Sequence, residues 1–205
     1  MPGDSLVSIV DDDEGIRRSL SRLFRSVRLP AETFGSAQAY LDRRAHDGPS
    51  CVVLDVRMPG LDGLELQETL AHREAQIVFI TGRGDVPMCA SAMKAGAIDF
   101  LTKPVNDEDL LRAVNRALAR SVEVRRTAAE HAAARARLDT LTPREFEVMR
   151  RVIAGLLNKQ IADELDAAEK TIKIHRGRVM EKMGVTSVAD LVRVAQAAGI
   201  VPASS

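Results

Sequence analysis

The chain has 205 residues, with 29 basic and 29 acidic side chains, and apolar residues make up 45% of it. This composition is typical of a globular protein with enough chain for two small domains, and it excludes a chain that is disordered throughout. The sequence has no run of about 18 apolar residues and an acidic start, which argues against a membrane-spanning helix and a signal peptide. We therefore expect a cytoplasmic protein with no membrane partner.

The first 120 residues alternate short apolar runs with amphipathic helical patterns. Continuous apolar strands separated by helices predict a parallel sheet covered on both faces. Five such units fit a flavodoxin-like, doubly wound α/β fold. The predicted strands are Leu6–Val10, Ala31–Phe34, Cys51–Leu54, Ile77–Ile80 and Ile98–Leu101, and the predicted helices are 14–27, 36–45, 63–73, 86–95 and one that begins at 106.

An Ala- and Arg-rich segment continues the helical pattern from residue 106, and no Gly or Pro interrupts it before Pro143. We expect the last helix of the first domain to lead into a helical linker that ends near Arg137, with a disordered tether as the alternative. The predicted organisation is a first domain over 1–120, a linker over 121–137 and a second domain over 138–205.

The second half carries only helix start and stop signals. The segment Thr142–Glu145 fits a capping box, and Asn158 is expected to cap the next helix. A short turn leads from there to a helix over 170–183, and a final helix lies within 187–199. Two helices joined by a short turn in a small all-helical domain predict a helix-turn-helix.

Polar residues follow the predicted strands: Asp11–Asp13 the first, Asp55 the third, Thr81 the fourth and Lys103 the fifth. The carboxyl ends of parallel strands converge on one crevice. Clustered carboxylates resist joint ionisation unless a cation lies among them, and oxygen ligands suit Mg²⁺. Asp55 is then a nucleophile that can form an aspartyl phosphate. Each residue alone is more often a helix cap, but their joint position makes the functional interpretation much the stronger one.

Residues 5–120 resemble a response-regulator receiver domain. The segments that match are IVDDDEGIRRSL, VVLDVRMPGLDGLEL, IVFITGRGDVP and KAGAIDFLTKPV. The resemblance implies that Asp55 is the phosphoacceptor, that Thr81 and Lys103 bind the phosphoryl group, and that the peptide bond before Pro104 is cis. The groups it implies for Mg²⁺ are the carboxylates of Asp11, Asp12 and Asp55 and the backbone carbonyl of Arg57.

The same resemblance implies a switch. Phosphorylation would attract the Thr81 hydroxyl and let Phe100 turn inward, which shifts the population between two packings. A plain core aromatic is the alternative role for Phe100. Similar proteins dimerise through the surface over 86–101, so we expect phosphorylation-dependent dimerisation there, and the contact residues are Val86, Met88, Lys94 and Asp99. We further hypothesise that Arg57 and Arg83 set the lifetime of the phosphoryl group, with plain surface arginines as the alternative.

The helix over 170–183 is basic on one face and apolar on the other. Ile172, His175, Val179 and Met183 recur at helical spacing and should face the core. The opposite face suits the major groove of DNA, where Lys and Arg contact guanine and an Ile can contact a thymine methyl group. The residues expected to contact DNA are Lys170, Thr171, Lys173, Ile174, Arg176 and Arg178.

Residues 139–201 resemble a LuxR-type DNA-binding domain, through LTPREFEVMRRVIAGLLNKQIADEL, KTIKIHRGRVMEKMGV and SVADLVRVAQAAGI. With the receiver, the chain is identified as a FixJ/NarL-family two-component response regulator, and the GRGDVP segment favours the FixJ-like branch. Two departures stand out. Ala168 replaces a capping residue, and Gly177 lacks a side chain for a contact on the exposed face.

The function expected is therefore transcription control by a regulator that is not an enzyme beyond its own phosphoryl transfer and autodephosphorylation. A sensor histidine kinase phosphorylates Asp55, the chain forms a homodimer, and the second domain binds double-stranded promoter DNA, with RNA polymerase as a further partner. A phosphatase of related fold would need an Asp where this chain has Arg57. The remaining alternative is a phosphorylation-independent DNA-binding regulator whose receiver is a dimerisation or protein-binding module.

Overall fold

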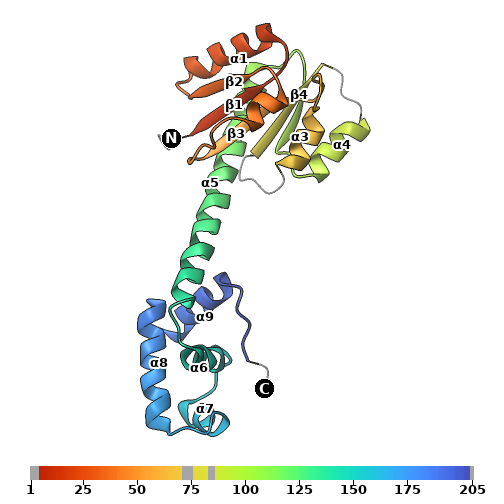
Figure 1. Ribbon diagram of the computed structural model, residues 1–205. Coiled ribbons are helices and arrows are strands. Elements are labelled where there is room, and N and C mark those ends of the chain that lie inside the picture. Colours follow the sequence, from red (N-terminus) through yellow and green to blue (C-terminus); the bar gives the residue numbers. More distant parts are fainter. Residues whose placement is uncertain (1–4, 71–75, 83–85, 204–205) are drawn as a thin grey trace. The chain divides into compact units, whose positions relative to one another are not determined.

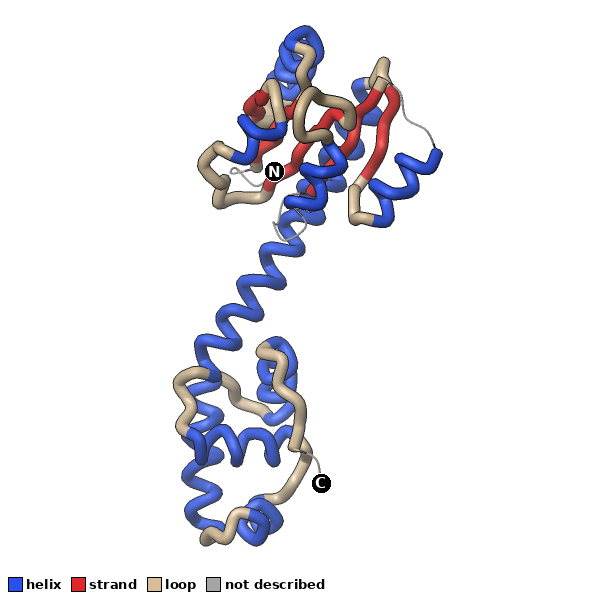
Figure 2. Tube along the Cα trace, turned by 45° about the vertical axis from the view of Figure 1, so that its right-hand side comes forward, coloured by secondary structure: helices blue, strands red, loops and turns tan. Residues whose placement is uncertain are grey.

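The computed structural model describes residues 5–70, 76–82 and 86–203 (Figure 1). Its contacts divide the chain into two compact units between Arg125 and Arg126. Strands and helices build the first unit, whereas the second contains helices, as the colours of Figure 2 show. None of the helices in these ranges combines the length and the apolar character that crossing a membrane requires.

A parallel sheet lies at the centre of the first unit, with the strand order β2-β1-β3-β4-β5. The predicted doubly wound fold is therefore confirmed. β3 and β4 extend one residue further at each end than predicted, so that Asp55 and Thr81 are the last residues of their strands. The strands are β1 (Leu6–Val10), β2 (Ala31–Phe34), β3 (Ser50–Asp55), β4 (Gln76–Thr81) and β5 (Asp99–Thr102).

Helices cover both faces of this sheet (Figure 1). α1 and the N-terminal part of α5 pack on one face, where Val7 and Ile9 are buried, and α2, α3 and α4 pack on the other, where Val10 and Val52 are buried. Burial on both sides explains why the strands are apolar at consecutive positions. The helices are α1 (Glu14–Ser26), α2 (Ala37–Leu41), α3 (Gly63–Thr69), α4 (Val86–Lys94) and α5 (Asp107–Leu138).

Two helices differ in length from the sequence prediction. α2 ends at Leu41 instead of residue 45, and Arg43 supplies the reason. The Arg43 guanidinium donates to the Tyr40 carbonyl at 3.2 Å and lies 3.7 Å from the centroid of the Tyr40 ring. That carbonyl is one that a longer helix would need as an acceptor in its next turn. The predicted end of α3 at residue 73 lies outside the described residues.

α5 is one continuous helix from Asp107 to Leu138, which agrees with the predicted helical linker rather than with a disordered tether. Acidic residues fill its first turn and arginines its last turn, and both complement the helix dipole. The division between the two compact units falls within this helix.

The second unit packs its helices around one apolar cluster that includes Met149, Ile161 and Ile172. The predicted capping box is present: the Thr142 hydroxyl accepts from the backbone of Glu145, and the Glu145 carboxylate accepts from the backbone of Thr142 at 2.9 Å. The helices are α6 (Pro143–Ile153), α7 (Asn158–Glu164), α8 (Glu169–Met183) and α9 (Val188–Ala197).

The prediction that Asn158 caps α7 is wrong. Asn158 is the first residue of the helix, and Leu157 is the N-cap. The backbone N–H of Leu157 is satisfied by the Gln160 side chain at 2.8 Å, so the helix start has a partner without an Asn cap. The Asn158 side chain accepts instead from Arg176 of α8, at 3.1 Å. As expected, Ala168 makes no side-chain cap at the start of α8.

Candidate functional site

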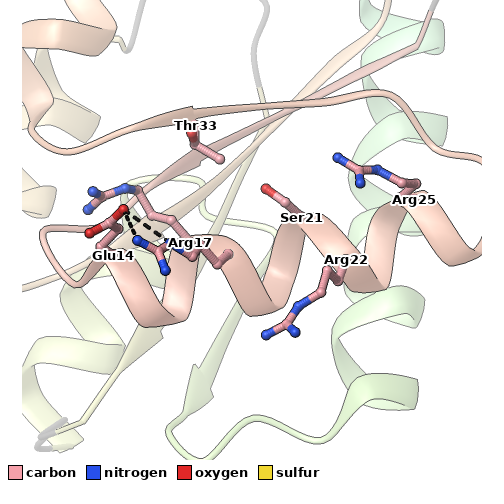
Figure 3. A pocket seen from close by; sticks show the side chains of 7 residues that line it. Glu14, Arg17, Ser21, Arg22, Arg25 and Thr33 are labelled. Atoms are coloured by element: carbon pink, nitrogen blue, oxygen red, sulfur yellow. Dashed lines mark hydrogen bonds and ion pairs between the residues drawn. The ribbon is translucent and has the colours of Figure 1, made fainter.

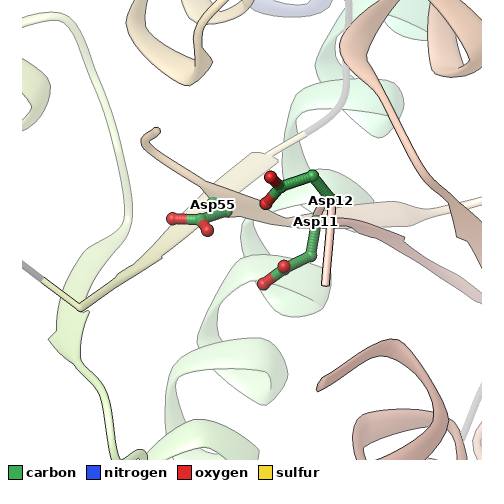
Figure 4. A group of neighbouring side chains, drawn as sticks. All are labelled: Asp11, Asp12 and Asp55. Carbon is green, nitrogen blue, oxygen red and sulfur yellow. The ribbon is translucent and has the colours of Figure 1, made fainter. Parts of the chain in front are cut away.

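Three carboxylates meet at the carboxyl ends of β1 and β3, as Figure 4 shows. Asp11 and Asp12 follow β1 directly, and Asp55 is the last residue of the neighbouring strand β3. Oxygen atoms from all three lie within 4.8 Å of one another. Asp11 and Asp55 are buried, whereas Asp12 is exposed at the rim of the cluster. The sheet therefore gathers the acids that the sequence predicted would lie together.

Lys103 bridges two of these carboxylates. Its Nζ donates to Asp11 Oδ2 at 2.7 Å and to Asp55 Oδ2 at 2.8 Å. The backbone N–H of Lys103 donates to the Thr81 carbonyl at 2.7 Å, which anchors the segment after β5 to the end of β4. The peptide bond between Lys103 and Pro104 is cis, as the sequence resemblance implied.

The electrostatics of the bridge favour a charged lysine. Burial lowers the pKa of Lys103, but hydrogen bonds to Asp11 and Asp55 outweigh burial and raise that pKa above its ordinary value. Burial raises the pKa of Asp11, and the hydrogen bond from Lys103 opposes this effect. A positive charge thus lies between two acids whose mutual repulsion would otherwise oppose their ionisation.

Backbone contacts at its other carboxylate oxygen and at its carbonyl hold Asp55 in place. The N–H of Arg57 donates to Asp55 Oδ1 at 3.3 Å. The first turn of α3 packs directly on the end of β3, because a Cβ atom at Gly63 would lie only 2.3 Å from the Asp55 carbonyl oxygen. A residue with a side chain at position 63 would therefore displace the strand end that carries Asp55.

The donor set fits a hard divalent cation. It offers carboxylate oxygens from three residues at one strand end, and magnesium prefers oxygen ligands and keeps several waters. Asp12 is exposed, so the cluster is open to water on its side. The Asp13 carboxylate does not belong to the cluster, because it accepts from the backbone of Ile16 and caps α1.

The remaining predicted switch residues lie along β4 and β5. Thr81 is buried at the end of β4, and Phe100 is half-buried in β5. The Phe100 ring packs on the Phe79 ring, with 6.0 Å between their centroids. Arg57 is exposed beside Asp55, and Arg83 lies outside the described residues.

The residues predicted for dimerisation differ in their surroundings. Val86 is 82% exposed, Lys94 is exposed, and Met88 is half-buried. Asp99 forms an ion pair with Arg116 of α5 in the same chain. The apolar Val86 is therefore presented to solvent, whereas the charge of Asp99 already has a partner.

α8 presents the predicted basic face to solvent. Ile172, Val179 and Met183 are buried in the core of the second unit, and Ile174 on the opposite face is 49% exposed. Gly177 has open space around it. The exposed residues predicted to contact DNA are Lys170, Thr171, Lys173, Ile174 and Arg178.

Two residues of α8 differ from expectation. Arg176 is half-buried, and its guanidinium donates to Asn158, so it connects α8 to the start of α7. His175 is packed as predicted, but its buried Nδ1 has no hydrogen-bond partner among the residues that the structure describes. The sequence did not indicate the Arg176 contact, because the polar start of α7 suggested a cap.

An ion pair between half-buried Lys182 and buried Glu145, which the sequence analysis missed, ties α8 to α6. Lys182 Nζ donates to Glu145 Oε2 at 2.6 Å and to the Thr140 carbonyl at 3.0 Å. The hydrogen bond from Lys182, followed by the one from the Thr142 backbone, lowers the pKa of Glu145 to about 2. The capping box indicated one partner of Glu145, but nothing in the residue spacing indicated the second, 37 positions away.

Each of the two units is similar to a known protein family. Residues 7–115 match the response regulator receiver domain, and residues 139–195 match the luxR family of bacterial regulatory proteins. Nodulation protein W of Bradyrhizobium diazoefficiens is 49% identical over 198 residues, which cover 96% of this chain and 87% of that protein. Transcriptional regulatory protein FixJ of the same organism is 41% identical over 95% of this chain and 96% of its own length. A low-resolution structure of the response regulator StyR covers 95% of this chain and 99% of its own, at 43% identity and a TM-score of 0.85.

The contribution of the Glu145–Lys182 pair to stability can be measured with Glu145→Gln. The amide oxygen can still accept from Thr142, but Lys182 loses its buried counter-charge, so we expect the free energy of unfolding of the second unit to fall by ~1–3 kcal/mol. A urea titration followed by the amide resonances of Val148 and Val179 reports on this unit alone. The control is Glu147→Gln, which removes a solvent-exposed ion pair with Arg144 and should change the free energy of unfolding by less than about 0.5 kcal/mol.

The same ion pair makes a prediction about pH. The pKa of Glu145 is about 2 in the folded chain, below the ordinary value of 4.5. Its contribution is therefore complete above pH 4.5 and is lost as the pH falls through about 2. Wild type should lose stability over this range relative to Glu145→Gln. Identical pH dependence in both proteins would show that the pair does not stabilise the fold.

Proposed function

The chain belongs to the response regulators that join a receiver domain to a LuxR-type DNA-binding domain, and from this membership we propose that phosphorylation of Asp55 controls its binding to promoter DNA. As a member of this family the chain is a transcription regulator. One observation carries the proposal beyond the family: the Asp55 carboxylate lies 2.8 Å from the Lys103 ammonium, beside the two acids that follow β1.

Asp55 is the acceptor in the proposed reaction. A carboxylate oxygen of Asp55 attacks the phosphorus of a phosphohistidine in the sensor kinase. The new O–P bond forms as the P–N bond breaks, and the imidazole leaves with the bonding electron pair. The Lys103 ammonium already donates a hydrogen bond to the Asp55 carboxylate. It could donate instead to a phosphoryl oxygen after transfer and so offset the added negative charge. The Thr81 hydroxyl, at the neighbouring strand end, is the second donor.

Magnesium is the proposed cofactor. The residues that would hold it are Asp11, Asp12 and Asp55, together with the backbone carbonyl of Arg57. A bound ion would neutralise negative charge on the phosphoryl group during transfer. The three carboxylates within 4.8 Å support this assignment. Hydrolysis of the acyl phosphate by water would end the signal, and this self-reaction is the only chemistry we assign to the chain.

The proposed switch connects Asp55 to the surface over 86–101. Thr81 would move toward the phosphoryl group, and Phe100 would rotate into the space that it leaves. The position of Phe100 supports this role: its ring is half-buried and packs against the ring of Phe79. A half-buried ring can rotate from this position to a more buried one. The exposed Val86 would then contribute apolar area to a homodimer.

We propose that α8 enters the major groove of promoter DNA. The face of this helix that lies opposite the core carries the exposed residues Lys170, Thr171, Lys173, Ile174 and Arg178. Arg176 has a smaller role than the sequence suggested, because it already bonds Asn158. In a dimer, two copies would contact half-sites about one helical turn apart, and RNA polymerase is a further proposed partner.

Sedimentation velocity tests the control step. Wild-type protein with Mg²⁺ should shift from monomer to dimer when acetyl phosphate is added, whereas Asp55→Ala should stay monomeric under both conditions. The same dimer in both proteins would favour the alternative function, in which the receiver is a phosphorylation-independent dimerisation module. Glu68→Ala, an exposed acid on α3, is the matched control and should behave like wild type.

The salt dependence of DNA affinity tests the role of α8. Lys173→Ala removes one positive charge from the proposed DNA-contacting face, so it should reduce the slope of log affinity against log salt by about one on a random-sequence duplex. Arg135→Ala removes another exposed positive charge, on α5, and should leave the slope unchanged. A slope that responds equally to both substitutions would mean that net charge, and not α8, determines binding.

A further inference from the structure

A groove lined by several arginines runs between α1 and the outer edge of β2 in the first unit (Figure 3). Two hollows of about 470 and 460 Å³ form it, and they are continuous because Ser21, Arg25 and Thr33 line both. Figure 3 shows Ser21 and Arg25 pointing to the side of α1 on which Thr33 lies. We call it the α1–β2 groove. Five arginines and two acids line it: Arg17, Arg18, Arg22, Arg25, Arg28, Glu14 and Glu32. The cations considered below are Arg22, Arg25 and Arg28.

These three cations are exposed, and their side chains form no ion pair or hydrogen bond with any residue in the described part of the chain. Their neighbours differ, because Arg18 is paired with Glu14 and Arg17 donates to the Asp11 carbonyl. Residues 1–125 carry 19 acids and 16 bases, so the groove is a local positive excess on a negatively charged unit. Like charges gathered in this way repel one another, and a bound anion would relieve the repulsion.

Arg28 strengthens the case for a ligand. Its φ is 58°, in the left-handed region that glycine adopts most easily. The position therefore carries an arginine where the backbone alone favours glycine. Because the Arg28 side chain is exposed, packing within the unit does not account for it.

The outer edge of β2 offers backbone groups beside these cations. β2 lies at the end of the strand order, and the carbonyls of Pro30 and Phe34 accept from β1. Alternate residues of a strand face opposite edges, so the N–H and C=O groups of Ala31 and Thr33 point outward. No other segment of the described residues pairs with this edge. An open edge of this kind is a template for an extended peptide.

We propose that the α1–β2 groove binds an extended acidic segment of a partner protein, which adds to β2 as a further strand. The side chains of Ala31 and Thr33 share a face with Val7 and Ile9, the face that α1 covers. Every second side chain of an added strand would therefore lie against α1, where alternating carboxylates meet the groove cations. A DNA duplex suits the site less well, because phosphates have no donor for the outward carbonyls.

Fluorescence anisotropy with a labelled alternating Val-Glu octapeptide tests the proposal on the full chain at low ionic strength. Wild type should bind it saturably. Arg25→Glu/Arg28→Glu should weaken binding at least about tenfold, because both contacts become repulsive. Arg44→Glu/Arg120→Glu makes the same change of net charge at exposed sites outside the groove and should weaken binding far less. Equal loss in both double variants, or none in the first, would overturn the proposal.

A second probe separates strand addition from charge attraction and requires no variant to fold. The same peptide with alternate backbone nitrogens methylated keeps its carboxylates but cannot pair along a strand edge, so its affinity for wild type should fall at least about tenfold. Equal affinity for both peptides would exclude strand addition. If neither peptide binds but the groove variant loses affinity for a random-sequence duplex, the ligand is nucleic acid and the proposal is wrong.

Discussion

The acidic site depends on the ion pairs that the Lys103 ammonium forms with Asp11 and Asp55, because these two buried carboxylates would otherwise repel each other. It reaches Asp11 after β1 and Asp55 at the end of β3, from a segment that follows β5. The strand order makes this possible, since β1 and β3 are neighbours and β4 alone separates β3 from β5. A charge held in this way would lie next to an incoming phosphoryl group, where it would act together with the proposed magnesium ion.

The second unit also contains a lysine paired with a buried carboxylate, and there the pair connects two helices. Lys182 near the end of α8 meets the buried Glu145, which also caps α6. One carboxylate thus fixes a helix start and holds the proposed DNA-contacting helix against its neighbour. Arg176 makes a second tie, to the first residue of α7. Two basic side chains of α8, Arg176 and Lys182, are therefore occupied by contacts within the domain. The exposed face around Lys173 and Ile174 stays accessible to a ligand.

Local patterns predicted most of the fold and the composition of the site. Apolar runs indicated all five strands. The polar residues after them indicated the acidic cluster, because the carboxyl ends of parallel strands lie at one edge of the sheet, where the doubly wound strand order makes these ends neighbours. Long-range pairings were not predictable from spacing: the second partner of Glu145 and the contact between Arg176 and Asn158 depend on how helices pack. The α1–β2 groove was missed for a related reason. Its arginines stand out only once β2 is known to be an edge strand beside α1.

The central claim is that Asp55, held by Lys103, accepts the phosphoryl group, and mapping the acyl phosphate tests it most directly. Protein treated with Mg²⁺ and acetyl phosphate would be reduced with borohydride, which converts an aspartyl phosphate to homoserine, and then digested for mass spectrometry. The account predicts homoserine at position 55 in wild type and none at Asp11 or Asp12. Homoserine at either of those two positions, or at no position in protein that still binds DNA in response to acetyl phosphate, would contradict it.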